Sequence, residues 1–150
     1  MSLHEKVMAE LKNAMKIKDT VALESLRAIK SALLLAQTEK GAAGGLKEAD
    51  ELRILQKLVK QRKDSASIYQ EQGRADLAEP ELAQAVIIEK FLPKQLDREE
   101  IESEVLSAIE QTGAEGMKDM GKVMGMVTKK LAGQADGKTI SAIVRDKLSS

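Results

Sequence analysis

Apolar and polar residues alternate along most of this chain with the period of an α-helix. Seven segments place apolar side chains at spacings of three and four residues, and this pattern predicts seven amphipathic helices. We expect them over residues 3–16, 20–39, 47–72, 76–92, 98–113, 117–133 and 138–148. The second segment has a wide apolar arc, which indicates burial on more than one side.

Several residues mark where these helices begin. Asp97 and Glu100 have the three-residue spacing of a capping box at the start of the fifth predicted helix. Asp19 or Thr20 is expected to cap the second helix, because both side chains accept hydrogen bonds from free backbone amides. Pro80 is compatible with the fourth helix only near its first turn, since proline lacks a backbone N–H.

The connecting segments divide the chain into two expected domains. Residues 41–45 read GAAGG and predict a flexible loop. Residues 93–96 read PKQL and predict an elbow between domains, because proline ends the preceding helix. We therefore expect an N-terminal domain of about four helices over residues 1–94 and a compact three-helix C-terminal domain over residues 97–150.

The composition supports an all-α fold and narrows the chemistry. The 150 residues include one Phe, one Tyr and no Trp, whereas sheets draw on aromatic and β-branched residues. The absence of Cys excludes disulfides and thiolate sites, and the single His4 excludes a multi-histidine metal site. No apolar run approaches the roughly 20 residues that span a bilayer. The expectation is a cytoplasmic protein with no membrane partner, metal or cofactor.

Catalytic signatures are absent as well. The sequence has no phosphate-binding GxxxxGK[ST] loop, no GxGxxG after a strand, no GxSxG elbow and no HExxH motif. The acidic residues of segment 99–104 favour a solvated helix face close to a helix N-terminus, with paired acid–base carboxylates as the alternative. We expect no catalytic residue in this chain by itself.

Charge is segregated along the chain although its formal net charge is zero. Residues 1–96 carry 16 basic and 14 acidic side chains, residues 97–116 carry one and seven, and residues 117–150 carry seven and three. Phosphate is attracted by local patches of positive charge more than by the total. The C-terminal segment is therefore the first candidate for binding a polyanion.

The sixth predicted helix has an unusual second face. Lys118, Lys122, Gly125 and Lys129 share the side opposite its apolar stripe, and Gly121 runs alongside. Glycine inside a helix costs about 0.5–1 kcal/mol relative to alanine, so two glycines call for a reason. One reason is close approach of another backbone, from RNA or from the fifth or seventh helix. The alternative interpretation is that these lysines simply form the water-facing side of an amphipathic helix.

A second basic strip follows one side of the third predicted helix. It consists of Arg53, Lys57, Lys60 and Lys63, extended locally by Arg62. The strip is either a solvated face or a further surface for phosphates. Because Tyr69 and Phe91 both lie on apolar faces, neither is expected to stack on bases. Any RNA is therefore expected to be read through its backbone and shape.

Several stretches together resemble the GatB/YqeY family over essentially the whole chain. They are LRAIKSAL (26–33), QRKDSASIYQEQGRADLAEPE (61–81), FLPKQL (91–96) and MGKVMGMVTKKLAGQADGKTISAIVRDKL (120–148). The last stretch is similar to the tail domain of the B subunit of the glutamine-dependent tRNA amidotransferase. In that enzyme the tail contacts tRNA while other domains carry out the chemistry.

The resemblance implies an all-α, two-domain protein with a tRNA-related role. By position it assigns the surface of the tail to Gly121, Lys122, Gly125, Lys129, Lys130, Gly133, Gly137 and Lys138. The first expectation is a tRNA-binding accessory protein that is not catalytic alone. The second is an interaction module that docks on an aminoacyl-tRNA or amidotransferase-type enzyme. The third, implied by the family's usual description, is a carbon–nitrogen ligase with glutamine as amido-N-donor.

Overall fold

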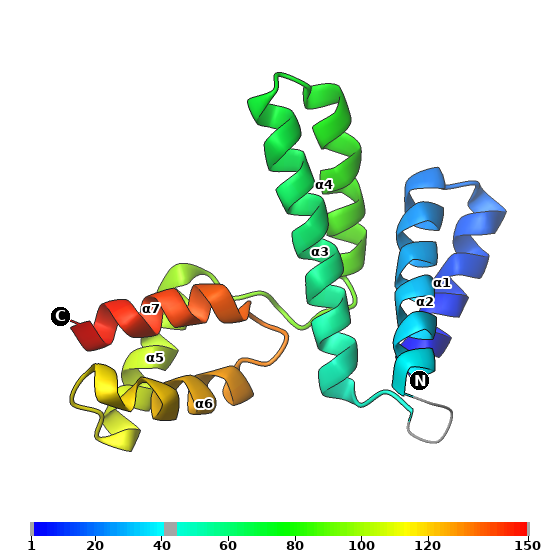
Figure 1. Ribbon diagram of the computed structural model, residues 1–150. Helices are drawn as coiled ribbons and strands as arrows, with labels where there is room; N and C mark the ends of the chain where they lie inside the picture. Colours follow the sequence, from blue (N-terminus) through cyan, green and yellow to red (C-terminus); the bar gives the residue numbers. More distant parts are fainter. Residues whose placement is uncertain (1, 41–44, 150) are drawn as a thin grey trace. The chain divides into compact units, whose positions relative to one another are not determined.

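The computed structural model describes residues 2–40 and 45–149, and all regular elements in this part of the chain are helices (Figure 1). The predicted all-α class is confirmed. The elements are α1 (Leu3–Ile17), α2 (Thr20–Lys40), α3 (Glu48–Glu71), α4 (Ala75–Glu89), α5 (Arg98–Thr112), the 3-10 turn η1 (Met117–Asp119), α6 (Met120–Lys130) and α7 (Gly137–Ser149). Residues 41–44 of the expected loop lie outside the described residues. Two compact units result, Met1–Leu92 and Pro93–Ser150.

Unit 1 consists of two helical hairpins, α1–α2 and α3–α4 (Figure 1). α3 and α4 pack along one another, and α2 packs on both α1 and α4. The buried side chains between them are Val7, Leu11, Ala14, Leu26, Ile29, Leu33, Leu55, Val59, Ala85 and Ile88. Each larger side chain of this kind contributes about 1.5–3 kcal/mol when it leaves water, so burial of the apolar stripes drives the assembly of the hairpins.

A polar network joins three helices of unit 1. The Arg62 guanidinium on α3 donates from Nε to Oε1 of Gln84 at 3.0 Å and from Nη1 to the carbonyl of Leu58 at 3.0 Å. The Gln84 amide on α4 donates in turn to Glu24 on α2 at 2.9 Å. Arg62 is therefore engaged in holding helices together and does not extend the basic strip as the sequence suggested.

Unit 2 is a three-helix bundle in which α5, α6 and α7 each pack on the other two. Its buried core comprises Ile101, Val105, Ala108, Val123, Val127, Leu131, Ile140, Ile143 and Val144. The segment 93–96 is fastened to the turn between α6 and α7. The Leu96 amide donates to the Gln134 carbonyl at 3.0 Å, and Gln95 Nε2 donates to the Gly133 carbonyl at 2.7 Å.

The predicted N-terminal caps are present at two helices. Asp97 accepts from the Glu100 amide at 2.8 Å, and Glu100 accepts from the Asp97 amide at 3.3 Å, which completes the capping box of α5. At α2 the sequence left two candidates. The structure selects Asp19, whose carboxylate accepts from the Ala22 amide at 3.1 Å.

Two helices differ from their predicted form. α4 begins at Ala75, so Pro80 lies inside the helix beyond its first turn. Pro80 is exposed, and so is Asp76, the residue four positions earlier whose carbonyl has no N–H partner at Pro80. The sixth predicted helix is divided, because residues 117–119 form the tighter turn η1 and α6 ends at Lys130, before Gly133. Asp119 accepts from the Glu115 amide at 3.0 Å, which draws the loop before α6 into that turn.

Candidate nucleic-acid interface

α6 divides into three arcs around its axis. Val123 and Val127 are buried in the core of unit 2. At 100° per residue, Gly121 and Gly125 share an arc on the side away from Val123 and Val127, and Lys122 with Lys129 occupies the arc next to these glycines. All members of these two outer arcs are exposed. We call the set Gly121, Lys122, Gly125 and Lys129 the α6 face.

The glycines of the α6 face border open space. A Cβ atom built on Gly121 or Gly125 meets no other described atom within 4 Å. The expectation that these glycines let α6 pack tightly on the fifth or seventh helix of the same chain is therefore wrong. The core of unit 2 uses the valine side of α6 instead, and the helix bears two helix-destabilising residues with no internal packing to account for them.

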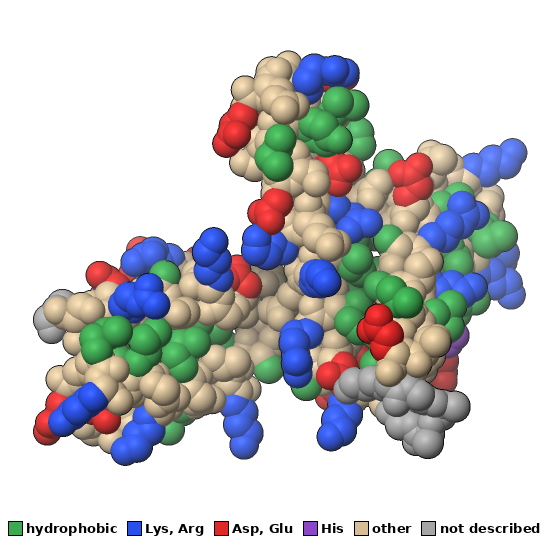
Figure 2. Space-filling model, in the orientation of Figure 1, with side chains coloured by type: hydrophobic (Ala, Val, Ile, Leu, Met, Phe, Trp, Pro, Cys, Tyr) green, Lys and Arg blue, Asp and Glu red, His purple; other side chains and the backbone are tan. Residues whose placement is uncertain are grey.

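Within the described part of the chain, the lysines of the α6 face form no ion pair with a carboxylate. Among residues 2–40 and 45–149, no ion pair involves Lys122 or Lys129, and the same holds for Lys138 in the first turn of α7. Figure 2 shows Lys and Arg side chains projecting from the side of unit 2 that α6 forms. Charge that is not compensated within the protein remains available to an external anion.

Two predicted lysines near the α6 face lie in different surroundings. Lys118 lies in η1, outside α6, and its ammonium is 3.9 Å from the Glu115 carboxylate, with both side chains largely exposed. An exposed pair at this distance is weak. Lys130 is paired more closely, with 2.7 Å between its Nζ and Oε2 of Glu104 on α5. Lys130 therefore contributes less free charge than its neighbour Lys129.

The two glycines that the resemblance assigned beyond α6 also differ from one another. Gly133 is buried and has φ of 78°, a left-handed conformation that glycine adopts without strain. It shapes the turn after α6 and does not lie on the surface, which corrects its assignment. Gly137 is exposed at the start of α7, where Asp136 accepts from the Thr139 amide at 2.7 Å and caps the helix.

Two of the four cations in the basic strip on α3, Lys60 and Lys63, are closely paired with carboxylates, and Arg53 is paired at a longer distance. The ion pairs of the strip are Arg53–Asp50 at 3.9 Å, Lys60–Asp64 at 2.7 Å and Lys63–Glu89 at 2.6 Å. Lys57 alone of the predicted strip forms no ion pair with a described residue. Glu89 lies on α4, so its approach to Lys63 depends on the packing of two helices and has no signal in the local sequence.

In residues 2–40 and 45–149, no cluster of three or more His, Cys, Asp or Glu side chains is arranged to hold a metal ion. No helix in the same residues is long and apolar enough to cross a membrane. The α6 face presents positive charge beside bare backbone, an arrangement suited to a polyanion that approaches closely.

Comparison with known proteins adds evidence over the whole chain. The family model described as "Yqey-like protein" matches residues 4–148. A protein from Pyrenophora tritici-repentis named "Altered inheritance of mitochondria protein 41, mitochondrial" is 30% identical over 145 residues, covering 94% of this chain and 78% of the relative. Its namesake in Clavispora lusitaniae is 35% identical over 91 residues, covering 61% of this chain and 52% of the relative.

A further similarity concerns a much longer protein. One component of the glutamyl-tRNA(Gln) amidotransferase of Thermococcus gammatolerans is 31% identical over 103 residues. The match covers 66% of this chain and 16% of that component. The similarity therefore concerns a small part of the longer protein.

Proposed function

The chain belongs to the YqeY-like family, and from this premise we propose that it is a tRNA-binding accessory protein that catalyses no reaction by itself. The α6 face of unit 2 is the proposed contact surface. Lys138 at the start of α7 adds a further exposed cation of the same unit.

One observation carries the proposal: among the described residues, Lys122 and Lys129 lack carboxylate partners, and they stand beside the open backbone of Gly121 and Gly125. Each lysine that neutralises a phosphate releases condensed counterions, which gives affinity that declines with salt. The missing side chains of the glycines let a sugar–phosphate backbone approach the helix more closely than leucine or lysine would permit.

The composition of unit 2 restricts how it would read RNA. The aromatic residues of the chain are Tyr69 and Phe91, and both precede unit 2. A surface without Phe, Tyr or Trp has no platform on which unstacked bases can stack. Contacts with phosphates and 2′-hydroxyls of a folded, double-helical region fit it better, and such contacts depend on shape more than on sequence.

The similarity to the amidotransferase component supports the choice of tRNA among RNAs. The name of that enzyme states that glutamyl-tRNA(Gln) is the molecule it modifies. Because the match covers 16% of the component, we transfer a tRNA-related role and not the amide-transfer reaction.

Fluorescence anisotropy with labelled total tRNA tests the proposal. At about 50 mM salt we expect binding in the micromolar range, weakening steeply by about 200 mM as counterion release requires. Changing Lys122→Glu together with Lys129→Glu should weaken binding at least about tenfold. The matched control, Lys12→Glu with Lys16→Glu, makes the same charge change on exposed positions of α1 and should weaken it much less. No binding at low salt, or equal losses in the two variants, would reject the proposal.

A second candidate is an interaction module that docks on a translation enzyme. The open space over Gly121 and Gly125 favours it, because a helix of a partner can also use a glycine arc for close approach. Pull-down with the wild-type chain and the Gly125→Leu variant distinguishes the cases. A protein that is retained equally by both does not use this arc.

The carbon–nitrogen ligase alternative has a direct assay. The purified chain is incubated with glutamine, ATP and glutamyl-tRNA, and release of glutamate and formation of amide are followed. The proposal expects neither product above the level of a protein-free control. Amide formation by the isolated chain would replace the accessory role with an enzymatic one.

A further inference from the structure

α7 carries a row of cations that matches the lysines of α6. Lys138 and Arg145 are exposed and seven residues apart, so they lie on one side of α7, about 10.5 Å apart along its axis. Lys122 and Lys129 have the same spacing on α6. We call the first pair the α7 row and the second pair the α6 row. Arg145 is new to this surface, because neither the local sequence pattern nor the family resemblance assigned it there.

The cations of the α7 row are uncompensated within the residues that the structure describes. No ion pair there involves Lys138 or Arg145, whereas Lys147 on the same helix lies 4.0 Å from Glu102 of α5. Asp146 follows Arg145 in sequence, but a step of 100° around α7 moves it toward the α5 side. The positive charge of the α7 row is therefore open to an external anion.

Two ion pairs show which sides of α6 and α7 face α5. Lys130 on α6 and Lys147 on α7 each approach a carboxylate of α5, at 2.7 Å and 4.0 Å. Gly121 lies nine residues before Lys130, which places it on the opposite side of α6, away from α5. Lys138 lies nine residues before Lys147 and is turned away from α5 in the same way. The glycines of α6 and the α7 row therefore border one face of unit 2, which we call the α6–α7 face.

The two rows run side by side on this face. α6 and α7 are antiparallel and pack on one another (Figure 1). Because residues 131–136 join them, Lys129 and Lys138 lie near that connection, and Lys122 and Arg145 lie seven residues further from it. Around the outside of α6, the lysines come first from the α5 side and the glycines follow, so the glycines lie between the rows. Figure 2 shows an apolar strip between α6 and α7, with Lys and Arg side chains on both sides of it.

The separation of the rows favours two nucleic-acid strands over one. The axes of packed helices are about 8–10 Å apart, and long side chains on their outer sides spread further. A single RNA strand that follows the α6 row leaves the α7 row unoccupied. A base-paired stem offers the phosphates of a second strand, and its A-form minor groove is wide and shallow. The glycines between the rows carry no side chain that would hold such a groove away from the helix.

We propose that the α6–α7 face binds a base-paired RNA stem across its shallow groove, with the α6 row on the phosphates of one strand and the α7 row on those of the other. The inference rests on the proposed tRNA-binding function, and it adds Arg145 and the assignment of one strand to each helix. Arg145 contributes more than Lys138, because a guanidinium donates two parallel hydrogen bonds to one phosphate.

Three labelled nucleic acids test the inference by fluorescence anisotropy with the full chain. They are an RNA hairpin with a fully paired stem, an unpaired RNA strand of equal length, and the DNA form of the hairpin. The RNA hairpin should bind best. The DNA hairpin should bind at least about threefold more weakly, because the minor groove of B-form DNA is narrow and lacks 2′-hydroxyls.

Paired variants separate the contributions of the two rows. Lys122→Gln with Lys129→Gln should weaken binding of both RNA probes. Lys138→Gln with Arg145→Gln should weaken the RNA hairpin at least about fivefold and lower its slope of log affinity against log salt by about 1.8, the value for two duplex phosphates. The same α7-row variant should change affinity for the unpaired strand by less than about twofold, because that strand follows the α6 row.

Matched variants exclude an effect of net charge or of folding. Lys12→Gln with Arg27→Gln removes the same charges from exposed positions of unit 1 and should leave the affinity and slope for the hairpin nearly unchanged. Arg145→Lys keeps the charge and should retain the slope, whereas Arg145→Gln alone should lower it by about 0.9. Circular dichroism checks that every variant keeps its helix content.

The outcomes separate this inference from the proposed function. Hairpin binding that is weakened by the α6-row variant and not by the α7-row variant would overturn the inference and leave the proposed function intact. Binding of total tRNA without binding of the RNA hairpin would do the same. Equal losses for hairpin and unpaired strand in the α7-row variant, or equal affinity for the RNA and DNA hairpins, would overturn the contact across the groove. If the chain binds neither tRNA nor any RNA probe at low salt, both the inference and the proposed function are wrong.

Discussion

The strip on α3 and the α6 face look alike in the sequence and differ in the structure. Both place lysines on one side of a helix opposite its apolar stripe. On α3, Lys60 is 2.7 Å from Asp64 and Lys63 is 2.6 Å from Glu89. On α6, Lys122 and Lys129 have no carboxylate partner among the described residues, and bare backbone lies beside them.

The difference shows that the count of lysines on a helix face is a poor guide to its free charge. A surface ion pair contributes little stability, about 0–1 kcal/mol, yet it cancels much of the field that an external phosphate would meet. The α3 strip is therefore suited to a solvated helix surface, and the α6 face to a partner that carries negative charge.

Among the variants that compare the α3 strip with the α6 face, the largest effect is expected where the glycine arc of the α6 face is filled. Gly121→Leu combined with Gly125→Leu adds bulk only toward open space, so the fold should persist while a close backbone is kept away. We expect tRNA affinity to fall about tenfold, or about 1.4 kcal/mol, in anisotropy titrations. Ser67→Leu on exposed α3 is the control and should leave affinity unchanged. If the double leucine variant binds tRNA with the affinity of the wild type, the open backbone of the α6 face does not contribute to binding and does not distinguish this face from the α3 strip.

A stability measurement sharpens the same comparison. Gly121→Ala and Gly125→Ala should each raise the free energy of unfolding by about 0.5–1 kcal/mol, because alanine favours the helix and its methyl group meets no other described atom within 4 Å. Chemical denaturation of unit 2 in the full chain gives the value. Gly113→Ala should instead destabilise, since Gly113 has φ of 69° at the end of α5. A lower free energy of unfolding in the α6 variants would mean that the fold of unit 2 requires glycine at these two positions.

Local patterns sufficed for the helices and their caps. The spacing of apolar residues predicted the stripes that carry Val123 and Val127 on α6, and the Asp97–Glu100 pair predicted the start of α5. These features depend on neighbours within about one turn, and such neighbours are visible in sequence.

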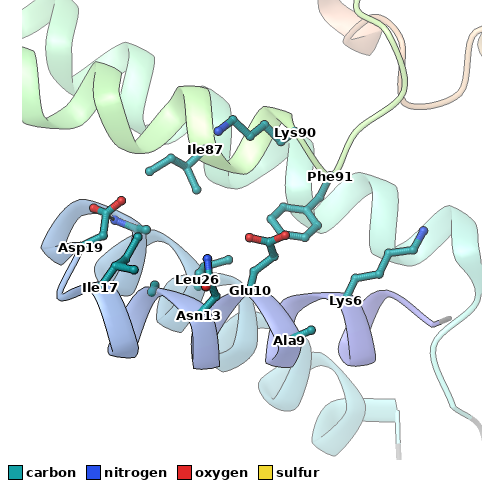
Figure 3. A pocket seen from close by; sticks show the side chains of 12 residues that line it. Lys6, Ala9, Glu10, Asn13, Ile17, Asp19, Leu26, Ile87, Lys90 and Phe91 are labelled. Atoms are coloured by element: carbon teal, nitrogen blue, oxygen red, sulfur yellow. Dashed lines mark hydrogen bonds between the residues drawn. The ribbon is translucent and has the colours of Figure 1, made fainter.

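Ion-pair partners that lie on a different helix could not be predicted from the sequence. Glu104 on α5 neutralises Lys130, and Glu89 on α4 neutralises Lys63, although neither carboxylate is near its lysine in sequence. A pocket beside Phe91, lined by α1, the start of α2 and the end of α4, was missed for the same reason, since it depends on how three helices pack (Figure 3). Gly133 was assigned to a surface by likeness alone, whereas its backbone conformation gives it a place inside a turn.

A smaller effect should follow when the α3 strip is made more like the α6 face. Glu89→Gln removes the carboxylate that holds Lys63 and leaves an amide of the same size. We expect tRNA affinity at low salt to rise about threefold, or about 0.7 kcal/mol, as Lys63 becomes available to phosphate. Glu71→Gln makes the same net-charge change at an exposed residue of α3 that forms no ion pair within the described chain, and it should have less effect. Equal gains in tRNA affinity in both variants would mean that net charge alone, and not the pairing of Lys63, determines binding.

The smallest effect separates two adjacent lysines of α6. Lys129→Ala removes a cation that no described carboxylate pairs with, whereas Lys130→Ala removes one that is already 2.7 Å from Glu104. We expect Lys129→Ala to weaken tRNA binding about twofold at moderate salt and to reduce the slope of log affinity against log salt by about 0.7–0.9, the value for one phosphate contact. Lys130→Ala should leave the slope nearly unchanged, because releasing Glu104 adds repulsion but removes no phosphate contact. Titrations at four or more salt concentrations resolve the slopes. If the two alanine variants change the slope equally, pairing within the protein does not decide which cations of this helix reach the RNA, and the contrast with α3 has another cause.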